Sequence, residues 1–272
     1  MKDAAIFLCS KTANMALPWA LAGVECWCVD IQHSIRRPVK QGNINFVWGD
    51  IRSWRRPEGL NLLFVAAFPP CTHDAISGAR DFETKGGNML RDSLETFEAA
   101  RVACSWSGVP YMIEHPVSCL VSIPHIGQPN HKFNPNDYGD PYTKETWLWT
   151  GNGFRMPTVA KPGDMFDKPT WVEPTQGSKM HLLPPGPDRQ NQRSATPPGF
   201  CDAVFWANAP EHVRLCHPDA PCEVRMGAAT GSRICSACSG FWNEDQRVEC
   251  GRGRFVEEPA NPGPILEAAG VL

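Results

Sequence analysis

The sequence predicts an α/β fold in which a doubly wound, mostly parallel sheet carries helices on its faces. Short apolar runs typical of buried strands alternate with loops and with stretches of helical periodicity. Polar residues follow the ends of four of these runs. A hydrophobic content of 42% and a charged content of 20% are values of globular proteins. The 272 residues therefore suffice for one large domain, or for a domain with an appendage.

The strands expected for the core are residues 4–9, 24–31, 44–48, 60–68 and 110–113. A short helix over 15–22, closed by Gly23, separates the first two. A longer helix is predicted from Asn88, as its N-cap, to about residue 107. Its apolar stripe consists of Leu90, Leu94, Phe97 and Cys104. A further strand is predicted at 145–150 and a helix at 201–207.

Four polar residues lie at the predicted carboxyl ends of four different strands. They are Asp30, Asp50, Cys71 and Glu114. Ligands of doubly wound sheets bind at this edge, so we expect the four side chains to converge. Asp30 follows Ser10 by about 20 residues, the spacing of an acid that binds ribose hydroxyls. The loop after Ser10 has no glycine, and an ordinary βαβ unit with Asp30 as a helix cap is the alternative.

Cys71 follows two prolines that end the strand at 60–68. Pro69 and Pro70 fix the backbone and remove two donors, so the cysteine is presented on a stiff loop. Nucleophilic cysteines need such positions, where a substrate can reach them. The alternative is a buried thiol that acts as a small hydrophobe.

Charge and hydropathy restrict the location of the protein and its partners. A net charge of −3 gives no general attraction to nucleic acid. Six basic residues lie close together in the sequence and could form either a solvated face or a phosphate-binding patch. They are Arg36, Arg37, Lys40, Arg52, Arg55 and Arg56. No apolar run reaches the roughly 18 residues of a membrane span. The first residues lack the plan of a signal peptide, so we expect a cytoplasmic protein.

The cysteines of the C-terminal region predict a structural zinc site. Six of the 12 cysteines lie between Cys201 and Cys250, and four of them have the spacing C-x5-C-x12-C-x2-C. The predicted ligands are Cys216, Cys222, Cys235 and Cys238. His217 or Cys250 could replace one ligand, because the first gap is wider than usual. The alternative is a set of reduced thiols in a loop-rich tail.

The order of these motifs resembles that of the DNA cytosine-5 methyltransferases, in particular their short, phage-borne members. Pro70-Cys71 matches the Pro-Cys nucleophile motif of the family, and Glu114-His115-Pro116 stands where the family has Glu-Asn-Val. Residues 7–10 resemble the first cofactor motif, and Asp30 resembles the ribose-binding acid. Residues 49–51 resemble the motif with the acid near the adenine, and 193–200 the late segment that packs under the cofactor.

Three departures from the family pattern stand out. Lys11 and Ala13 replace the glycines expected in the cofactor loop. His115 replaces the asparagine that helps to hold the nucleophile loop. No Gln-x-Arg-x-Arg segment is found, and Lys144 is the only cation of the comparable region, 140–144.

The resemblance implies a Rossmann-like methyltransferase fold, with S-adenosylmethionine as cofactor and double-stranded DNA, its cytosine flipped out, as partner. It further implies a monomer in the cytoplasm of a bacterial or phage-infected cell, acting in DNA modification such as restriction–modification. Cys71 would be the nucleophile and Glu114 would contact N3 of the cytosine. The implied cofactor-binding residues are Phe7, Cys9, Ser10, Asp30, Ile31, Asp50, Ile51 and Pro69. The implied substrate-binding residues are Pro70, Thr72, His73, Arg80, His115 and Lys144.

The expected organisation places the catalytic core at 1–116 and a loop-rich insert, a candidate DNA-recognition region, at 117–192. A helix at 193–207 would return to the core, followed by a small zinc-binding module at 208–257 and a tail at 258–272. Two other functions stay open. One is a related cytosine-modifying enzyme that uses another one-carbon donor or a free nucleotide. The other is a catalytically inactive, DNA-binding or protein-binding relative.

Overall fold

The computed structural model describes residues 1–163, 169–186, 189–220, 224–226, 233–235 and 241–242, and it divides the chain into two units. The first unit, Met1–Pro218, contains an eight-stranded mixed sheet with strand order β3-β4-β2-β1-β5-β6-β8-β7. The second unit is Asp219–Leu272. Its described part is an antiparallel sheet of β11 (Phe241–Trp242), β10 (Arg233–Cys235) and β9 (Val224–Met226), in that order.

Parallel strands form the middle of the large sheet, as the sequence predicts. They are β4 (Ile44–Trp48), β2 (Glu25–Asp30), β1 (Lys2–Leu8), β5 (Leu60–Ala67) and β6 (Tyr111–Pro116). The antiparallel strands β3 (Val39–Gln41), β8 (Thr146–Gly151) and β7 (His131–Phe133) complete the two sides. The strand order reverses between β1 and β5, so the loops after these two strands flank the crevice where ligands of such sheets bind.

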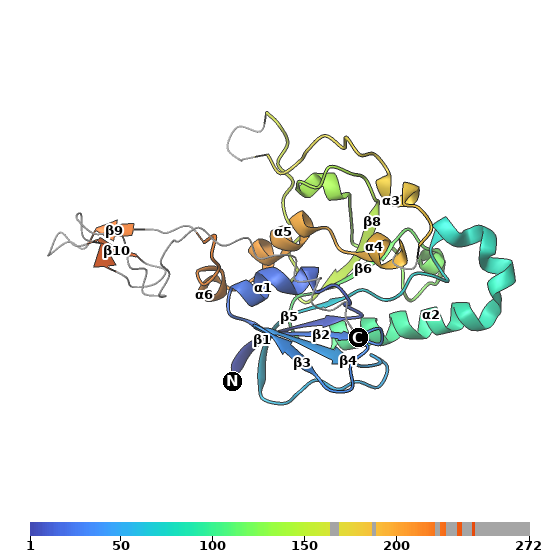
Figure 1. The fold of residues 1–272 in the computed structure, drawn as a ribbon, viewed down its shortest axis with the longest axis horizontal. Coiled ribbons are helices and arrows are strands. Elements are labelled where there is room, and N and C mark those ends of the chain that lie inside the picture. The colour runs from blue at the N-terminus through green and yellow to red at the C-terminus, as the bar shows by residue number, and fades with distance from the viewer. Residues whose placement is uncertain (164–168, 187–188, 221–223, 227–232, 236–240, 243–272) are drawn as a thin grey trace. The chain divides into compact units, whose positions relative to one another are not determined.

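Helices cover both faces of the sheet (Figure 1). On one face lie α1 (Leu17–Leu21), which continues a 3-10 turn at Asn14–Ala16, and α5 (Pro198–Asn208). On the other face lies α2 (Phe82–Ser105). The remaining short helices of the described chain are α3 (Lys179–Leu182), α4 (Arg189–Ser194) and α6 (Glu211–Arg214), with 3-10 turns at Ile76–Asp81, Cys119–Ser122 and Pro135–Tyr138.

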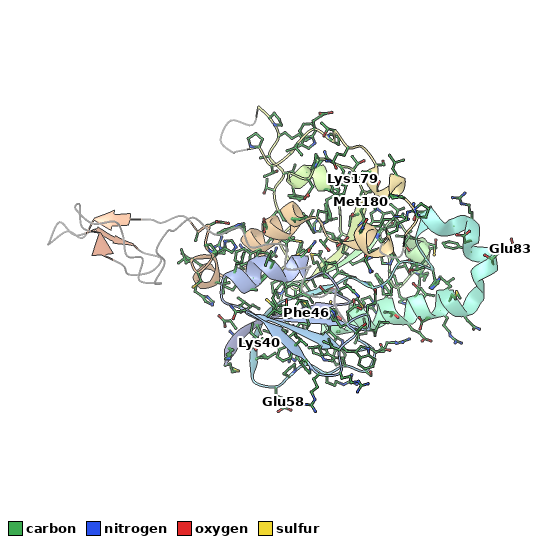
Figure 2. All side chains as sticks on the ribbon, viewed as in Figure 1. Lys40, Phe46, Glu58, Glu83, Lys179 and Met180 are labelled. Carbon is green, nitrogen blue, oxygen red and sulfur yellow. The ribbon has the colours of Figure 1, made fainter. Side chains whose placement is uncertain are left out.

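Aromatic packing joins these layers, and side chains fill the space on both faces of the sheet (Figure 2). The fully buried Trp19 of α1 stacks on Phe64 of β5 with ring centroids 4.9 Å apart, and it meets the edge of Phe205 from α5 at 5.3 Å. On the opposite face Phe97 of α2 packs edge-on against Trp149 of β8 at 5.2 Å. Such buried aromatic contacts stabilise beyond the area that they bury.

The connections between the parallel strands differ in kind. Within the described residues, α1 lies between β1 and β2 and α2 between β5 and β6, as predicted, whereas residues 31–38 and 49–59 contain no helix. α2 is interrupted at Gly86, whose φ of 72° and ψ of 169° are not helical, so the helix that reaches Ser105 begins just before the predicted N-cap, Asn88. Figure 1 shows this change of direction in the turquoise ribbon. The helical segment before Gly86, which begins at Phe82, was not predicted.

The strand expected at 110–113 is longer than predicted. β6 extends to Pro116 because β8 pairs with it in antiparallel register, with Glu114 opposite Leu148 and His115 opposite Trp147. Glu114 and His115 are therefore held within a strand. The backbone that positions them is part of the central sheet.

Within the described residues, no helix combines the length and the apolar character needed to cross a membrane.

We predict that Gly199→Ala destabilises the protein by about 1–3 kcal/mol, as overpacking of a close contact does. Gly199 lies in the first turn of α5, its N–H donates to Asp140 Oδ2 at 3.1 Å, and an added Cβ would overlap the carbonyl group of Tyr138. Gly87→Ala is the matched control, because no atom lies near its Cβ position and alanine favours the helix. Chemical unfolding of both variants tests this, and equal stabilities would contradict it.

Candidate functional site

Cys71 lies in the loop that leaves β5 at the carboxyl edge of the sheet. The loop starts from a fixed point, since the Phe68 N–H donates to the carbonyl oxygen of Leu8 on β1 at 2.9 Å. Pro69 is buried and Pro70 is exposed, so the chain turns outward before the cysteine. The Ala75 N–H donates to the Cys71 carbonyl at 3.0 Å and closes a turn. The thiol is thereby held half-buried on a constrained loop.

Glu114 lies beside this loop on the neighbouring strand. Because Ile113 of β6 pairs with Ala67 of β5, Glu114 falls just past the last paired position of these strands. The residue is 6% exposed. Its Oε2 accepts a hydrogen bond from Thr196 Oγ1 at 2.8 Å, and its Oε1 lies 3.7 Å from Nζ of Lys144. One carboxyl oxygen is thus fixed by a hydroxyl and the other faces a mostly buried ammonium.

Thr196 connects Glu114 with the loop after β1. Its hydroxyl donates to Glu114, and its backbone carbonyl accepts from Asn14 Nδ2 at 2.9 Å. The segment 193–200 therefore packs against both the candidate catalytic carboxyl and the candidate cofactor loop. The sequence pointed to this segment but gave no role to Thr196, because a threonine between α4 and α5 carries no signal of its own.

The surroundings of Cys71 set its protonation. Burial raises the pKa of the thiol above its ordinary value, and the nearby negative charges of Asp74 and Glu114 raise it further. The positive charge of Lys144 acts in the opposite direction and lowers this pKa. Lys144, Glu114 and Cys71 are therefore close enough to influence one another. Lys144 is the group that favours the thiolate.

The loop after β1 contains strained backbone, at one of whose positions, Ala13, the resemblance leads one to expect glycine. Cys9 and Ala13 have φ angles of 52° and 56°, in the left-handed region that non-glycine residues rarely adopt. Strain of this kind is typical of ligand-binding segments. Burial, together with the charges of Asp30 and Asp50, raises the pKa of the Cys9 thiol. The ends of β1, β2 and β4 therefore meet, as predicted from the strand ends.

Asp30 is a buried acid at the carboxyl end of β2. The residue is only 4% exposed, and burial raises the pKa of its carboxyl group. Its Oδ1 accepts a hydrogen bond from the Gln32 N–H at 2.7 Å. Within the described chain no other hydrogen bond to this carboxyl group is found.

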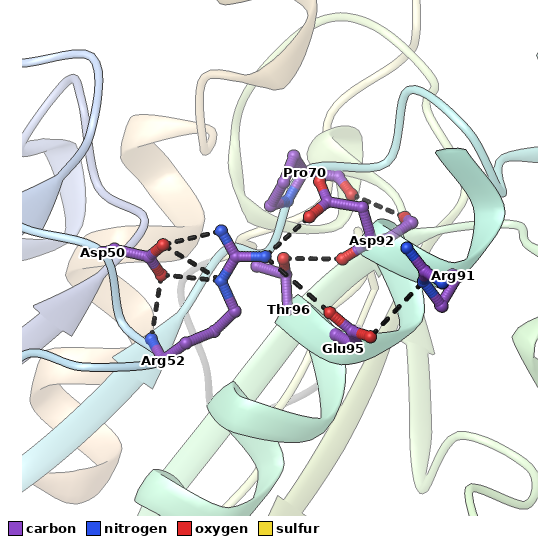
Figure 3. A network of polar contacts seen from close by, with 8 residues as sticks. Asp50, Arg52, Pro70, Arg91, Asp92, Glu95 and Thr96 are labelled. Atoms are coloured by element: carbon purple, nitrogen blue, oxygen red, sulfur yellow. Dashed lines mark hydrogen bonds and ion pairs between the residues drawn. The ribbon is translucent and has the colours of Figure 1, made fainter. Parts of the chain in front are cut away.

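Asp50 is differently engaged (Figure 3). Arg52 Nε lies 3.0 Å from its Oδ1, and an Arg52 terminal nitrogen lies 2.6 Å from its Oδ2. The other terminal nitrogen of Arg52 bonds Asp92 Oδ1 of α2 at 2.6 Å. The hydrogen bonds from Arg52 lower the pKa of Asp50. Both carboxylate oxygens are therefore paired with a cation, an arrangement that the sequence did not indicate.

The other predicted site residues differ in accessibility. Phe7 and His115 have fully buried side chains, and Ser10 and Ile51 are buried as well. Ile31 is 59% exposed beside Asp30. Thr72 and Arg80 are exposed, and His73 is half-buried. The structure thus brings Cys71, Glu114 and Lys144 together at one edge, whereas Phe7 packs in the core.

The predicted zinc ligands fall largely outside the described residues. Cys222, Cys238 and Cys250 are among the residues that the structure does not describe, whereas Cys216 follows α6 and Cys235 ends β10. In the described parts of the chain, no group of three or more histidine, cysteine or acidic side chains could hold a metal ion. His217 is buried against Phe205 and Trp206. The zinc site stays a prediction.

The described geometry defines the first unit as an α/β protein with a mixed, centrally parallel sheet and a thiol–carboxyl pair at its carboxyl edge. No family model and no curated protein matches the sequence. Among solved structures, a similar chain is that of a candidate DNA modification methyltransferase encoded within an E. coli prophage, with a TM-score of 0.37 and 16% identity. The match covers 55% of this chain and 46% of that chain. Similarity at this level does not define the activity of the present chain.

We predict that alkylation of Cys71 by iodoacetamide has its pH midpoint above that of an exposed cysteine, because burial raises the pKa of the thiol. Lys144→Met removes the charge that lowers this pKa, so the midpoint should move further upward and the reaction should slow below it. Mass spectrometry of the Cys71 peptide measures both. Lys132→Met is the control, since Lys132 lies over the Trp147 ring instead. A midpoint that does not change in Lys144→Met would contradict the assignment.

Proposed function

We propose that the protein is a DNA cytosine-5 methyltransferase. The observation that carries the proposal is the proximity of three groups: the Cys71 thiol in the loop after β5, the Glu114 carboxyl on β6 and the Lys144 ammonium just before β8. A nucleophile, a hydrogen-bonding acid and a charge that favours the thiolate are the groups that this reaction needs. The resemblance of Pro70-Cys71 and Glu114 to the family motifs agrees with this set.

In the proposed reaction, Cys71 Sγ forms a bond to C6 of the cytosine. The electron pair of the C5–C6 double bond then makes C5 nucleophilic, and the ring nitrogen N3 gains negative charge. Glu114 stabilises that charge through a hydrogen bond from its protonated carboxyl group to N3. Thr196 donates to Oε2 of this carboxyl, so Oε1 is the oxygen proposed to contact the base, in place of its 3.7 Å contact with Lys144 Nζ. After methyl transfer, a base such as water removes the C5 proton, and the electron pair of the C5–H bond reforms the C5–C6 double bond and expels Cys71 Sγ as the thiolate.

The residues around the loop after β1 fit an adenosyl ligand in part. When bound, S-adenosylmethionine would supply an electrophilic methyl group to C5. Asp30 has an oxygen available for a ribose hydroxyl, and Ile31 exposes an apolar side chain next to it. Asp50 does not fit the role near the adenine while Arg52 pairs with both of its oxygens.

The substrate in this proposal is a cytosine flipped out of double-stranded DNA, because an aromatic base within the stack cannot be reached by a thiol. The exposed Thr72 and Arg80 lie on the segment that follows Cys71, and they are candidates for contacts with the DNA backbone. The net charge of −3 means that such contacts depend on local cations.

A second candidate is a related cytosine-modifying enzyme that uses another one-carbon donor. The pairing of Asp50 with Arg52 favours it, because this pairing closes the contact assigned to adenine. An assay with radiolabelled S-adenosylmethionine, offered DNA or dCTP, separates the two candidates. Label in DNA supports the first, and no label in either substrate supports the second.

We predict that DNA containing 5-fluorocytosine, with S-adenosylmethionine present, traps the wild-type protein covalently. The fluorine at C5 cannot leave as a proton does, so the Sγ–C6 bond persists. Cys71→Ser should trap none, as gel electrophoresis under denaturing conditions would show. Cys119→Ser is the control, because Cys119 is a half-buried cysteine that follows β6, and it should trap normally. An undiminished adduct with Cys71→Ser would exclude Cys71 as the nucleophile.

We also predict that Asp30→Ala weakens the binding of S-adenosylmethionine by roughly tenfold to 100-fold, the range for one hydrogen bond to a charged group. Isothermal titration calorimetry measures the change. Asp3→Ala is the matched control, since Asp3 lies at the start of β1 and pairs with His212 instead. Equal affinities of Asp30→Ala and wild type would place the methyl donor elsewhere.

A further inference from the structure

Asp74 is a fully buried carboxyl group beneath the Cys71 loop, and the proposed reaction gives it no role. Its N–H lies in the turn that follows Cys71, 3.4 Å from the Cys71 carbonyl oxygen. Burying a carboxyl group is costly unless it is hydrogen-bonded or paired. The contacts that satisfy Asp74 therefore indicate what the residue does.

These contacts connect the loop with α2 and β6. Asp74 Oδ2 accepts a hydrogen bond from Ser93 Oγ of α2 at 2.6 Å. The same hydroxyl lies 3.3 Å from the carbonyl oxygen of Pro70, directly before the nucleophile. Asp74 Oδ1 lies 3.3 Å from Nε2 of His115 on β6. The loop is thus held from below by one helix and one strand.

The Asp74–His115 contact is enclosed. Both side chains are fully buried, and in the described chain neither Oδ1 of Asp74 nor Nε2 of His115 has an aligned hydrogen-bond partner. His115 Nδ1 lies 3.2 Å from the Pro116 carbonyl, which leaves Nε2 for Asp74. Phe97 and Trp149 pack edge-on around the imidazole at 5.7 and 6.5 Å. The 3.3 Å contact of Oδ1 with Nε2 therefore pairs two buried polar groups.

The backbone of Asp74 is fixed as well. Its carbonyl oxygen accepts from Ser118 Oγ at 3.0 Å and from the Cys119 N–H at 3.0 Å. Two residues further on, the Ile76 N–H donates to the Val117 carbonyl at 2.9 Å. The segment that follows Cys71 is therefore tied to the turn after β6.

We propose that Asp74 is a positioning residue that, through Ser93 and His115, holds the Cys71 loop in register with Glu114. This inference rests on the proposed function for its catalytic readout. Removal of Asp74 should have two opposite effects on Cys71, because its carboxyl group fixes the loop but its negative charge disfavours the thiolate. Loss of Asp74 should make the thiol easier to ionise and yet slower to attack a base.

The test compares Ser93→Ala with Thr96→Ala in the full-length protein. Ser93 and Thr96 are buried hydroxyl residues of α2, but the Thr96 hydroxyl donates to the Asp92 carbonyl of its own helix instead of the loop. At saturating 5-fluorocytosine DNA and S-adenosylmethionine, Ser93→Ala should form the adduct between about tenfold and 10²-fold more slowly, as expected of a misplaced nucleophile. DNA affinity should stay unchanged, and Thr96→Ala should react like wild type. Equal adduct rates for the two variants would overturn the proposal.

Asp74→Asn provides a readout that a merely structural role would not change. Asparagine keeps an acceptor for Ser93 but removes the negative charge near Cys71. The pH profile of Cys71 alkylation should move to lower pH while adduct formation slows. A profile that does not move, or adduct formation at the wild-type rate, would contradict the inference.

Hydrogen exchange separates this inference from the proposed function. If wild type forms no adduct, the proposed function fails, and the amides of Ile76 and Cys119 still report on the anchoring of the loop. Both amides should exchange faster in Ser93→Ala and in Asp74→Asn than in wild type or Thr96→Ala. Unchanged exchange would overturn the positioning role whatever the enzyme does.

Discussion

The parallel pairing of β1 with β5 is the constraint on which the site depends. These strands pair along their whole length, from Lys2 opposite Leu60 to Leu8 opposite Ala67, and the register shifts once, between Ala4 and Ala5. Parallel pairing brings both carboxyl ends to the same edge, and the reversal of strand order between them opens the crevice there. The strained loop after Leu8 and the proline-stiffened loop after Ala67 therefore start side by side. Cys71 and the candidate cofactor loop follow directly from these two strands, whereas Asp30, Asp50 and Glu114 come from β2, β4 and β6 of the same sheet.

Individual polar contacts complete this edge from distant parts of the chain. Thr196 bonds Glu114, 82 residues away, and its carbonyl bonds Asn14, 182 residues away. Asp74 similarly joins the nucleophile loop to Ser93 and to Ser118. Thr196 comes from the segment before α5, whereas the partners of Asp74 come from α2 and from the turn after β6, and closing loops of such lengths costs entropy that tertiary burial must offset. The chemistry of the site is thus a consequence of the whole first unit.

Much of this arrangement follows from local sequence, and the remainder does not. The apolar runs and the prolines before Cys71 were sufficient to predict the parallel strands and the strand end that carries the thiol. The helical segment that begins at Phe82 was not predicted, because Gly86 permits a bend that joins it to the predicted helix. The extension of β6 depends on pairing with β8, and the partners of Asp50, Asp74 and Glu114 depend on side chains far away in sequence. Periodicity contains no information about such contacts.

The two edge strands of the large sheet affect how the protein behaves in concentrated solution. A sheet ends in backbone groups that can pair with a strand of another molecule and so begin aggregation. Here each outermost strand, β3 and β7, is three residues long, and the middle residue of each is a lysine, Lys40 and Lys132. Short length and a charged side chain both disfavour the addition of a foreign strand. The long, apolar parallel strands are thereby kept in the interior, where neighbouring copies of the chain cannot extend them.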